Sequence, residues 1–145
     1  MTAAVLERET QTGSVRPMLG PLSTAAILAA GAVYTAVRDP YQAGFFPECV
    51  FLAASGHYCP GCGGLRATHE LLHGNLVGAL DMNPVVVLVI IPLIVVSLAW
   101  WGLRSAGVRL PSVTISTPMA WALPLFLFAF WIARNIPALE PFLAP

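Results

Sequence analysis

The sequence contains no lysine, and only 10% of its 145 residues are charged. Soluble domains usually carry about 25% charged residues, so this scarcity argues against an ordinary soluble protein. Seven arginines balance seven acidic residues, which leaves no strongly basic surface of the kind that binds nucleic acid. The 57% hydrophobic content and the mean hydropathy of +0.77 instead favour a protein of the lipid bilayer.

Three apolar runs are candidates for membrane-spanning helices, which need about 20 apolar residues and sometimes as few as about 17. They cover residues 22–37, 85–103 and 119–133. Pro84, at the start of the second run, suits the first helical position because its missing N–H is not needed there. We expect Pro92 to kink this helix. The predicted fold class is an all-α membrane protein: three transmembrane helices, a Cys-rich loop and an amphipathic interfacial helix.

Residues 19–145 are predicted to form a single membrane domain, in which a segment over residues 38–84 carries the cysteines and histidines. Residues 1–18 are predicted to be a disordered tail. We favour an uncleaved first helix over a signal peptide, because Glu7 and Glu9 make the preceding segment a poor positively charged leader.

The arginines near the ends of the apolar runs weakly specify the orientation. A cytoplasmic N-terminus places four of them inside and three outside, in agreement with the positive-inside tendency. Those outside are Arg38, Arg66 and Arg134. We therefore predict a multi-pass protein of the cell membrane whose Cys loop is extracytoplasmic, where thiols tend to oxidise. Arg134, directly after the third run, is expected to reach the lipid headgroups.

All three cysteines lie in the one polar stretch of the chain. Cys59 and Cys62 form a Cys-x-x-Cys motif at the start of a helical run, where the helix dipole is expected to lower thiol pKa values. Cys49 could supply a third sulfur. We predict a structural cluster held by a disulfide or a metal ion, with zinc the candidate cofactor. The alternative is a thiol–disulfide redox protein that uses Cys59 and Cys62.

The histidines offer further metal ligands. Zinc usually takes four ligands, so His57, His69 or His73 could complete the cysteine set. His69-Glu70-Leu71-Leu72-His73 also matches H-E-x-x-H, in which two histidines on one helical face bind zinc and the glutamate acts as general base. No third protein ligand is evident in the sequence, so a zinc metalloprotease is the less favoured alternative. The sequence thus favours a protein without catalytic activity.

Residues 65–80 are predicted to form an amphipathic segment, broken near Gly74, that lies at the membrane surface. Its expected apolar side holds Leu65, Leu72, Leu76 and Ala79. On the polar side, an arginine near the membrane is unfavourable unless it is paired or reaches water. We therefore expect Arg66 to be at least half buried and to donate charge-assisted hydrogen bonds, for which its planar fork is suited.

Residues 59–84 resemble the small bacterial membrane proteins of domain-of-unknown-function family 2752. Their hallmark is a C-P-x-C-G-x-x-R-A core followed by Leu-Leu-x-Gly and by Asn-Pro at the start of an apolar helix. The corresponding residues are Cys59-Pro60-Gly61-Cys62-Gly63-Gly64-Leu65-Arg66-Ala67, Leu71-Leu72-His73-Gly74 and Asn83-Pro84. Cys49 and Gly56 also fit, and the likeness extends over about residues 38–135.

This resemblance implies a multi-pass membrane protein without an established activity. It also implies structural roles for Gly56, Pro60, Gly63, Arg66, Gly74, Asn83 and Pro84 in the loop. Position 65 often holds threonine in these proteins and holds leucine here, which argues against a hydroxyl role. His69 and Glu70 lie outside the pattern, which argues against the protease. The expected partners are the lipid bilayer and a membrane protein, either of another kind or a second copy.

Overall fold

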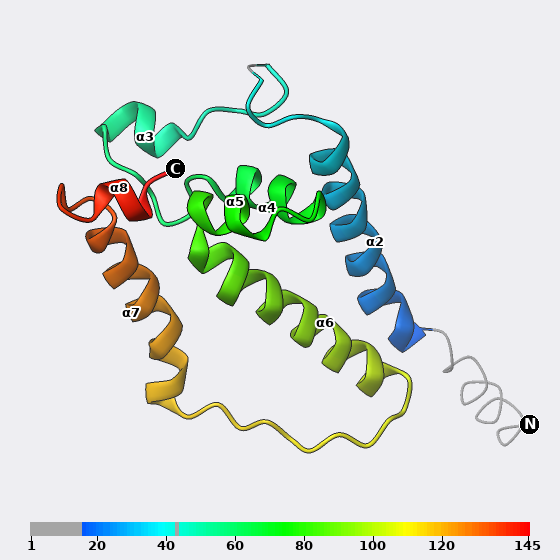
Figure 1. Cartoon of the computed structure of the whole chain (residues 1–145). Helices are drawn as coiled ribbons and strands as arrows, with labels where there is room; N and C mark the ends of the chain where they lie inside the picture. The colour runs from blue at the N-terminus through cyan, green and yellow to red at the C-terminus, as the bar shows by residue number, and fades with distance from the viewer. Residues whose placement is uncertain (1–15, 43) are drawn as a thin grey trace, which may run out of the picture.

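The computed structural model describes residues 16–42 and 44–145, and within them every regular element is helical (Figure 1). The predicted all-α class is therefore confirmed for this part of the chain. The elements are α2 (Arg16–Val37), α3 (Val50–Ser55), α4 (Gly64–Leu72), α5 (Leu76–Met82), the π-helical segment η1 (Val86–Ile90), α6 (Ile91–Ser105), α7 (Thr117–Ala133) and α8 (Glu140–Leu143).

Three long apolar helices correspond to the three predicted runs. Met18–Val37 and Val86–Ser105 are each long and apolar enough to cross a membrane, while Thr117–Ala133 is a shorter apolar helix of 17 residues. Residues 1–15 of the predicted tail lie outside the described residues. Residues 16–18 belong to α2, so the tail was predicted to extend too far.

The chain passes back and forth between two ends of the molecule (Figure 1). The start of α2 and the loop over residues 106–116 lie at one end, and α3, α4, α5 and α8 gather at the other. Helices α2 and α6 pack together, and Gly20 permits this because a Cβ there would lie 2.7 Å from the ring of Trp101. Helix α7 stands apart from α6 in this view.

The irregularity expected at Pro92 takes the form of the π-helical segment η1 just before it. Pro92 has no N–H to donate to the carbonyl four residues earlier. The preceding amide of Ile91 donates to Val86 O, a wider i→i−5 bond. A π-bulge is one way in which a helix absorbs such a break.

A small core joins α4, α5 and η1. It consists of Ala67, Ala79 and Val87, against which Leu71, Leu80 and Met82 pack. The break predicted near Gly74 is confirmed, because α4 ends at Leu72 and α5 begins at Leu76. Of the predicted apolar side, Ala79 is buried in this core, while Leu65, Leu72 and Leu76 are exposed. The short alanine side chains face the core because they allow the helix backbones to approach closely.

Candidate metal centre at the cysteine loop

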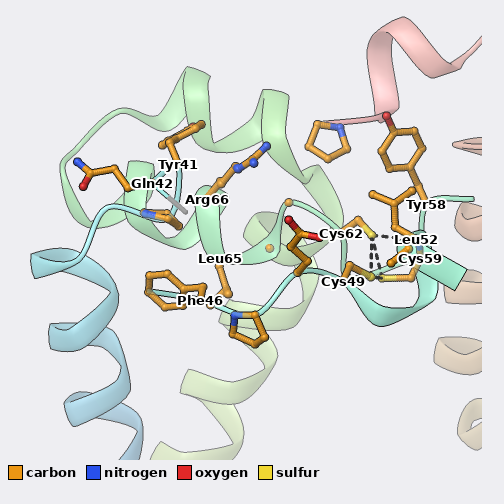
Figure 2. A pocket seen from close by; sticks show the side chains of 18 residues that line it. Tyr41, Gln42, Phe46, Cys49, Leu52, Tyr58, Cys59, Cys62, Leu65 and Arg66 are labelled. Atoms are coloured by element: carbon orange, nitrogen blue, oxygen red, sulfur yellow. Dashed lines mark hydrogen bonds between the residues drawn. The ribbon is translucent and has the colours of Figure 1, made fainter. Parts of the chain in front are cut away.

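The three cysteine sulfurs converge at the end of the molecule that holds the short helices (Figure 2). The Sγ–Sγ distances are 3.1 Å for Cys59–Cys62, 3.4 Å for Cys49–Cys62 and 3.6 Å for Cys49–Cys59. All three thiols are free. Four thiolates about 2.3 Å from a tetrahedral zinc ion would lie roughly 3.8 Å apart, which is close to the observed spacing. The convergence of the cysteines predicted from the sequence is confirmed, and the cluster could hold a metal ion.

Local turns place these sulfurs. Cys49 directly precedes α3, and Cys62 directly precedes Gly63, the N-cap of α4. Between them the Cys59–Cys62 segment folds into a turn in which the Cys62 amide donates to Cys59 O at 3.2 Å. The Cys59 amide donates to Cys62 Sγ, also at 3.2 Å. The motif therefore points two sulfurs inward toward Cys49.

Asn83 holds this turn from the other side and is fully buried. Its Nδ2 donates to Pro60 O at 2.9 Å and to Cys62 O at 3.0 Å. Its Oδ1 accepts the Val86 amide at 3.0 Å, which caps the helix that begins at Pro84. All of the polar atoms of this side chain are thus used, and one residue ties the cysteine turn to the second apolar helix.

Arg134, the residue after α7, is completely buried against the cysteine turn. Its Nη1 lies 3.0 Å from Cys59 O, 3.3 Å from Pro60 O and 3.2 Å from Cys62 O, donating to these carbonyls. Its Nε and Nη2 have no hydrogen-bond partner among the described residues. The expectation that Arg134 reaches the lipid headgroups is therefore wrong, because the turn offers a cluster of carbonyl acceptors.

The ionisable groups that act on the Arg134 charge are Cys62, Cys59 and Tyr58. Burial lowers the pKa of its guanidinium, while charged Cys62, Cys59 and Tyr58 raise that pKa. Buried charges in proteins are normally paired. A thiolate formed at one of the cysteines would be such a partner.

Asn135 adds a second link between α7 and the loop that sequence analysis missed. Its Oδ1 accepts the Tyr58 amide and its Nδ2 donates to Tyr58 O, each at 2.9 Å. The Phe51 and Trp131 rings also meet edge to face, with centroids 5.6 Å apart. The sequence signals these contacts only by the polar pair Arg134-Asn135 directly after an apolar helix. The sequence does not indicate which residues this pair contacts.

The three thiols differ in acidity. The pKa of Cys62 is raised to about 12, mainly by burial and also by its hydrogen bonds to Cys59 and Cys49. Hydrogen bonding to the backbone of Leu52 lowers the pKa of Cys49, with a further contribution from Cys62. The dipole effect expected for Cys62 is thus outweighed by burial. A metal ion would have to displace the Cys62 proton, so its binding should strengthen as pH rises.

An open pocket of about 810 Å³ adjoins the cluster, and all three cysteines line it. Figure 2 shows Tyr41 and Arg66 toward the other end of this pocket. The Arg66 guanidinium lies 5.1 Å from the centroid of the Tyr41 ring. Among the described residues we find no hydrogen bond from Arg66, so the charge-assisted hydrogen bonds expected from it are not observed. Arg134 is the arginine that donates to the loop carbonyls.

None of the three histidines joins the cysteine cluster. His57 is exposed and its Nδ1 lies 2.8 Å from Ser55 O. Nδ1 of His69 lies 2.7 Å from Thr35 O, and Nδ1 of His73 lies 2.8 Å from His69 O. The suggestion that a histidine completes the cysteine set is therefore not supported.

The H-E-x-x-H match lacks the surroundings of a protease site. His69 and His73 do lie together, with ring centroids 4.3 Å apart. No third histidine, cysteine or acid within the described residues forms a metal-binding group with them. Glu70, the would-be base, accepts from Tyr41 Oη at 3.0 Å and from Asn75 Nδ2 at 2.7 Å. These contacts give the segment a structural role.

Gly63 should tolerate no side chain, because it adopts φ +77° and a Cβ would lie 2.6 Å from Met82 O. Gly74 is a matched control, since it has φ +79° with nothing within 4 Å of its Cβ position. Positive φ costs a non-glycine residue about 1–2 kcal/mol at either site. We expect Gly63→Ala to lower the free energy of unfolding by at least about 1 kcal/mol more than Gly74→Ala. Equal effects in unfolding measurements would show that the close approach at Gly63 is unimportant.

Residues 49–97 match the model of a family described as a protein of unknown function, DUF2752. This finding confirms the resemblance, over a shorter segment than the expected 38–135. The matched segment contains the three cysteines, Arg66 and Asn83, and it ends before Arg134. Comparison with curated proteins found no match, and neither did comparison with solved structures.

Proposed function

We propose that this protein is a multi-pass membrane protein in which Cys49, Cys59 and Cys62 bind a divalent metal ion, zinc being the best fit. The observation that carries the proposal is the convergence of three free sulfurs beside Arg134, a buried cation without an acidic partner. A divalent ion with three thiolates has a net charge of −1, and Arg134 supplies the compensating +1. A disulfide would use only two of the three sulfurs that converge here.

The proposed role of the ion is structural. The cysteine turn contacts α3 through Cys49, the second apolar helix through Asn83 and the end of α7 through Arg134. An ion bound at this point would fix three elements that otherwise share few contacts. We further propose that the loop faces the extracytoplasmic side and that it contacts a membrane protein partner or a second copy.

The exposed apolar side chains of the long helices support the bilayer as a partner. Ile27 and Val37 of α2 are 72% and 74% exposed, and Leu125 of α7 is 61% exposed. Such surfaces are stable in lipid and would promote aggregation in water. The two helices that are long enough to span a membrane also support the bilayer as a partner.

A thiol–disulfide redox protein is the second candidate, because Cys59 and Cys62 are the closest pair of sulfurs at 3.1 Å. In that case the two thiols would pass two electrons and two protons to the disulfide of a partner protein. Against this role, Cys62 is buried and its pKa is raised to about 12. A thiol of this kind attacks slowly, since the thiolate is the nucleophile.

Metal analysis with thiol counting tests the proposal on protein purified in detergent. We expect one divalent ion per chain and three thiols that a reagent reaches only after chelation. Cys59→Ser should weaken binding by more than the roughly 10- to 100-fold typical of losing a contact around a metal site, because it removes a ligand. The control His69→Asn should keep the ion. Metal-free protein with two thiols missing per chain would instead establish a disulfide.

A further inference from the structure

The cysteine cluster supplies three ligands and opens on one side into the pocket described above. Zinc sites with three protein ligands keep a fourth position for an external group. No further histidine, cysteine or acid among the described residues lies near enough to all three sulfurs to fill it. Glu48 lines the pocket but does not belong to this group. The described residues therefore leave the fourth position to another group.

The rest of the pocket indicates what that ligand looks like. Phe46, Leu52 and Leu65 line it with apolar surface, and Arg66 lines it with a positive charge. In Figure 2 Arg66 and the cysteines lie at different ends of the pocket. Arg66 has no hydrogen-bonded acidic partner among the described residues, and stacking on Tyr41 holds its guanidinium in place. The pocket volume of about 810 Å³ lies within the range of small-molecule sites.

We propose that this pocket binds a small thiol that carries a carboxylate, with the sulfur completing the metal site and the carboxylate on Arg66. This inference rests on the metal site proposed above. A sulfur donor matches the three cysteine sulfurs, because thiophilic ions favour sulfur. On binding, the thiol loses its proton to water and its sulfur replaces a water molecule on the ion, with no change in oxidation state. An apolar spacer between the two groups would contact the apolar wall.

The test uses the full chain in detergent, loaded with cobalt as a spectroscopic substitute for zinc. Three matched probes are titrated: 6-mercaptohexanoate, the neutral 6-mercaptohexanol, and hexanoate, which has no thiol. We expect 6-mercaptohexanoate to change the thiolate-to-cobalt absorption at a concentration about tenfold lower than 6-mercaptohexanol, because a charge-assisted hydrogen bond adds to the sulfur bond. Hexanoate should leave this absorption unchanged.

Arg66→Gln should remove the tenfold preference while leaving the binding of 6-mercaptohexanol unchanged. Arg38→Gln is the control, since Arg38 stacks 4.8 Å from the centroid of the Phe45 ring and does not line the pocket. Equal binding of the two thiols to the wild type, or a preference that survives Arg66→Gln, would overturn the role of Arg66. An equal response to hexanoate would overturn the sulfur donor.

Two further outcomes separate this proposal from the metal site itself. Cobalt protein that shows thiolate absorption but no response to any thiol would mean that the fourth position is closed. The ligand proposal would then be wrong and the metal site would stand. Protein without thiolate-to-cobalt absorption would overturn both.

Discussion

Replacing Arg134 with methionine should weaken metal binding by about 10- to 100-fold, the range typical of residues that support metal ligands. Arg134 is completely buried and donates to the carbonyls of Cys59, Pro60 and Cys62. Methionine fills much of the same space but removes both the charge and the donors. The thiolates would then lose their compensating cation, and the carbonyls would lose a hydrogen-bond partner.

Competition with a chromophoric chelator measures this affinity. Arg104→Met is the control, because Arg104 also ends an apolar helix but is exposed. It should leave the affinity unchanged. Arg134→Lys keeps the charge with a compact ammonium in place of the planar fork, so we expect an intermediate loss. An unchanged affinity in Arg134→Met would contradict the charge balance on which the proposed function rests.

Asn83→Asp should lower the free energy of unfolding by about 3 kcal/mol. The substitution keeps the shape and the oxygen that accepts the Val86 amide. It removes the two donated hydrogen bonds to Pro60 O and Cys62 O. Each such bond contributes about 1 kcal/mol, although Arg134 Nη1 still donates to both carbonyls. A carboxylate oxygen would also face two carbonyl oxygens.

Equilibrium unfolding of the purified protein measures this loss. The matched control is Asn75→Asp, because Asn75 also caps a helix through its Oδ1 but is exposed. There we expect a loss below about 1 kcal/mol, since water replaces the missing donor. If both substitutions had the same effect, the buried contacts between Asn83 and the cysteine turn would not stabilise the fold.

Local sequence patterns predicted most of the helices and the members of the cluster. Uninterrupted apolar runs specify long helices because a segment in lipid must satisfy its backbone hydrogen bonds within itself. Pro84 and the residues around Gly74 marked a helix start and a break, since their backbone preferences act locally. The Cys-x-x-Cys spacing brings two sulfurs together within one turn, as observed for Cys59 and Cys62.

Contacts between distant segments decided the rest, and these depend on how the helices pack. Arg66 and Arg134 are both arginines close to apolar segments of the sequence. Only Arg134 donates to the turn over Cys59–Cys62. It does so across 75 residues of sequence. The same limit explains why the sequence grouped Ala79 with Leu65, Leu72 and Leu76 on one apolar side, while in the structure Ala79 is buried and these leucines are exposed.

The sequence by itself determined the helical class, the apolar runs and the three sulfurs that could bind a metal. Only the tertiary structure decided which arginine is buried beside them, which asparagine holds their turn and which side of the cluster is open. The physical reason is that helix formation follows from the spacing of neighbouring residues. The environment of a buried charge, by contrast, is set by whatever segments the fold brings around it.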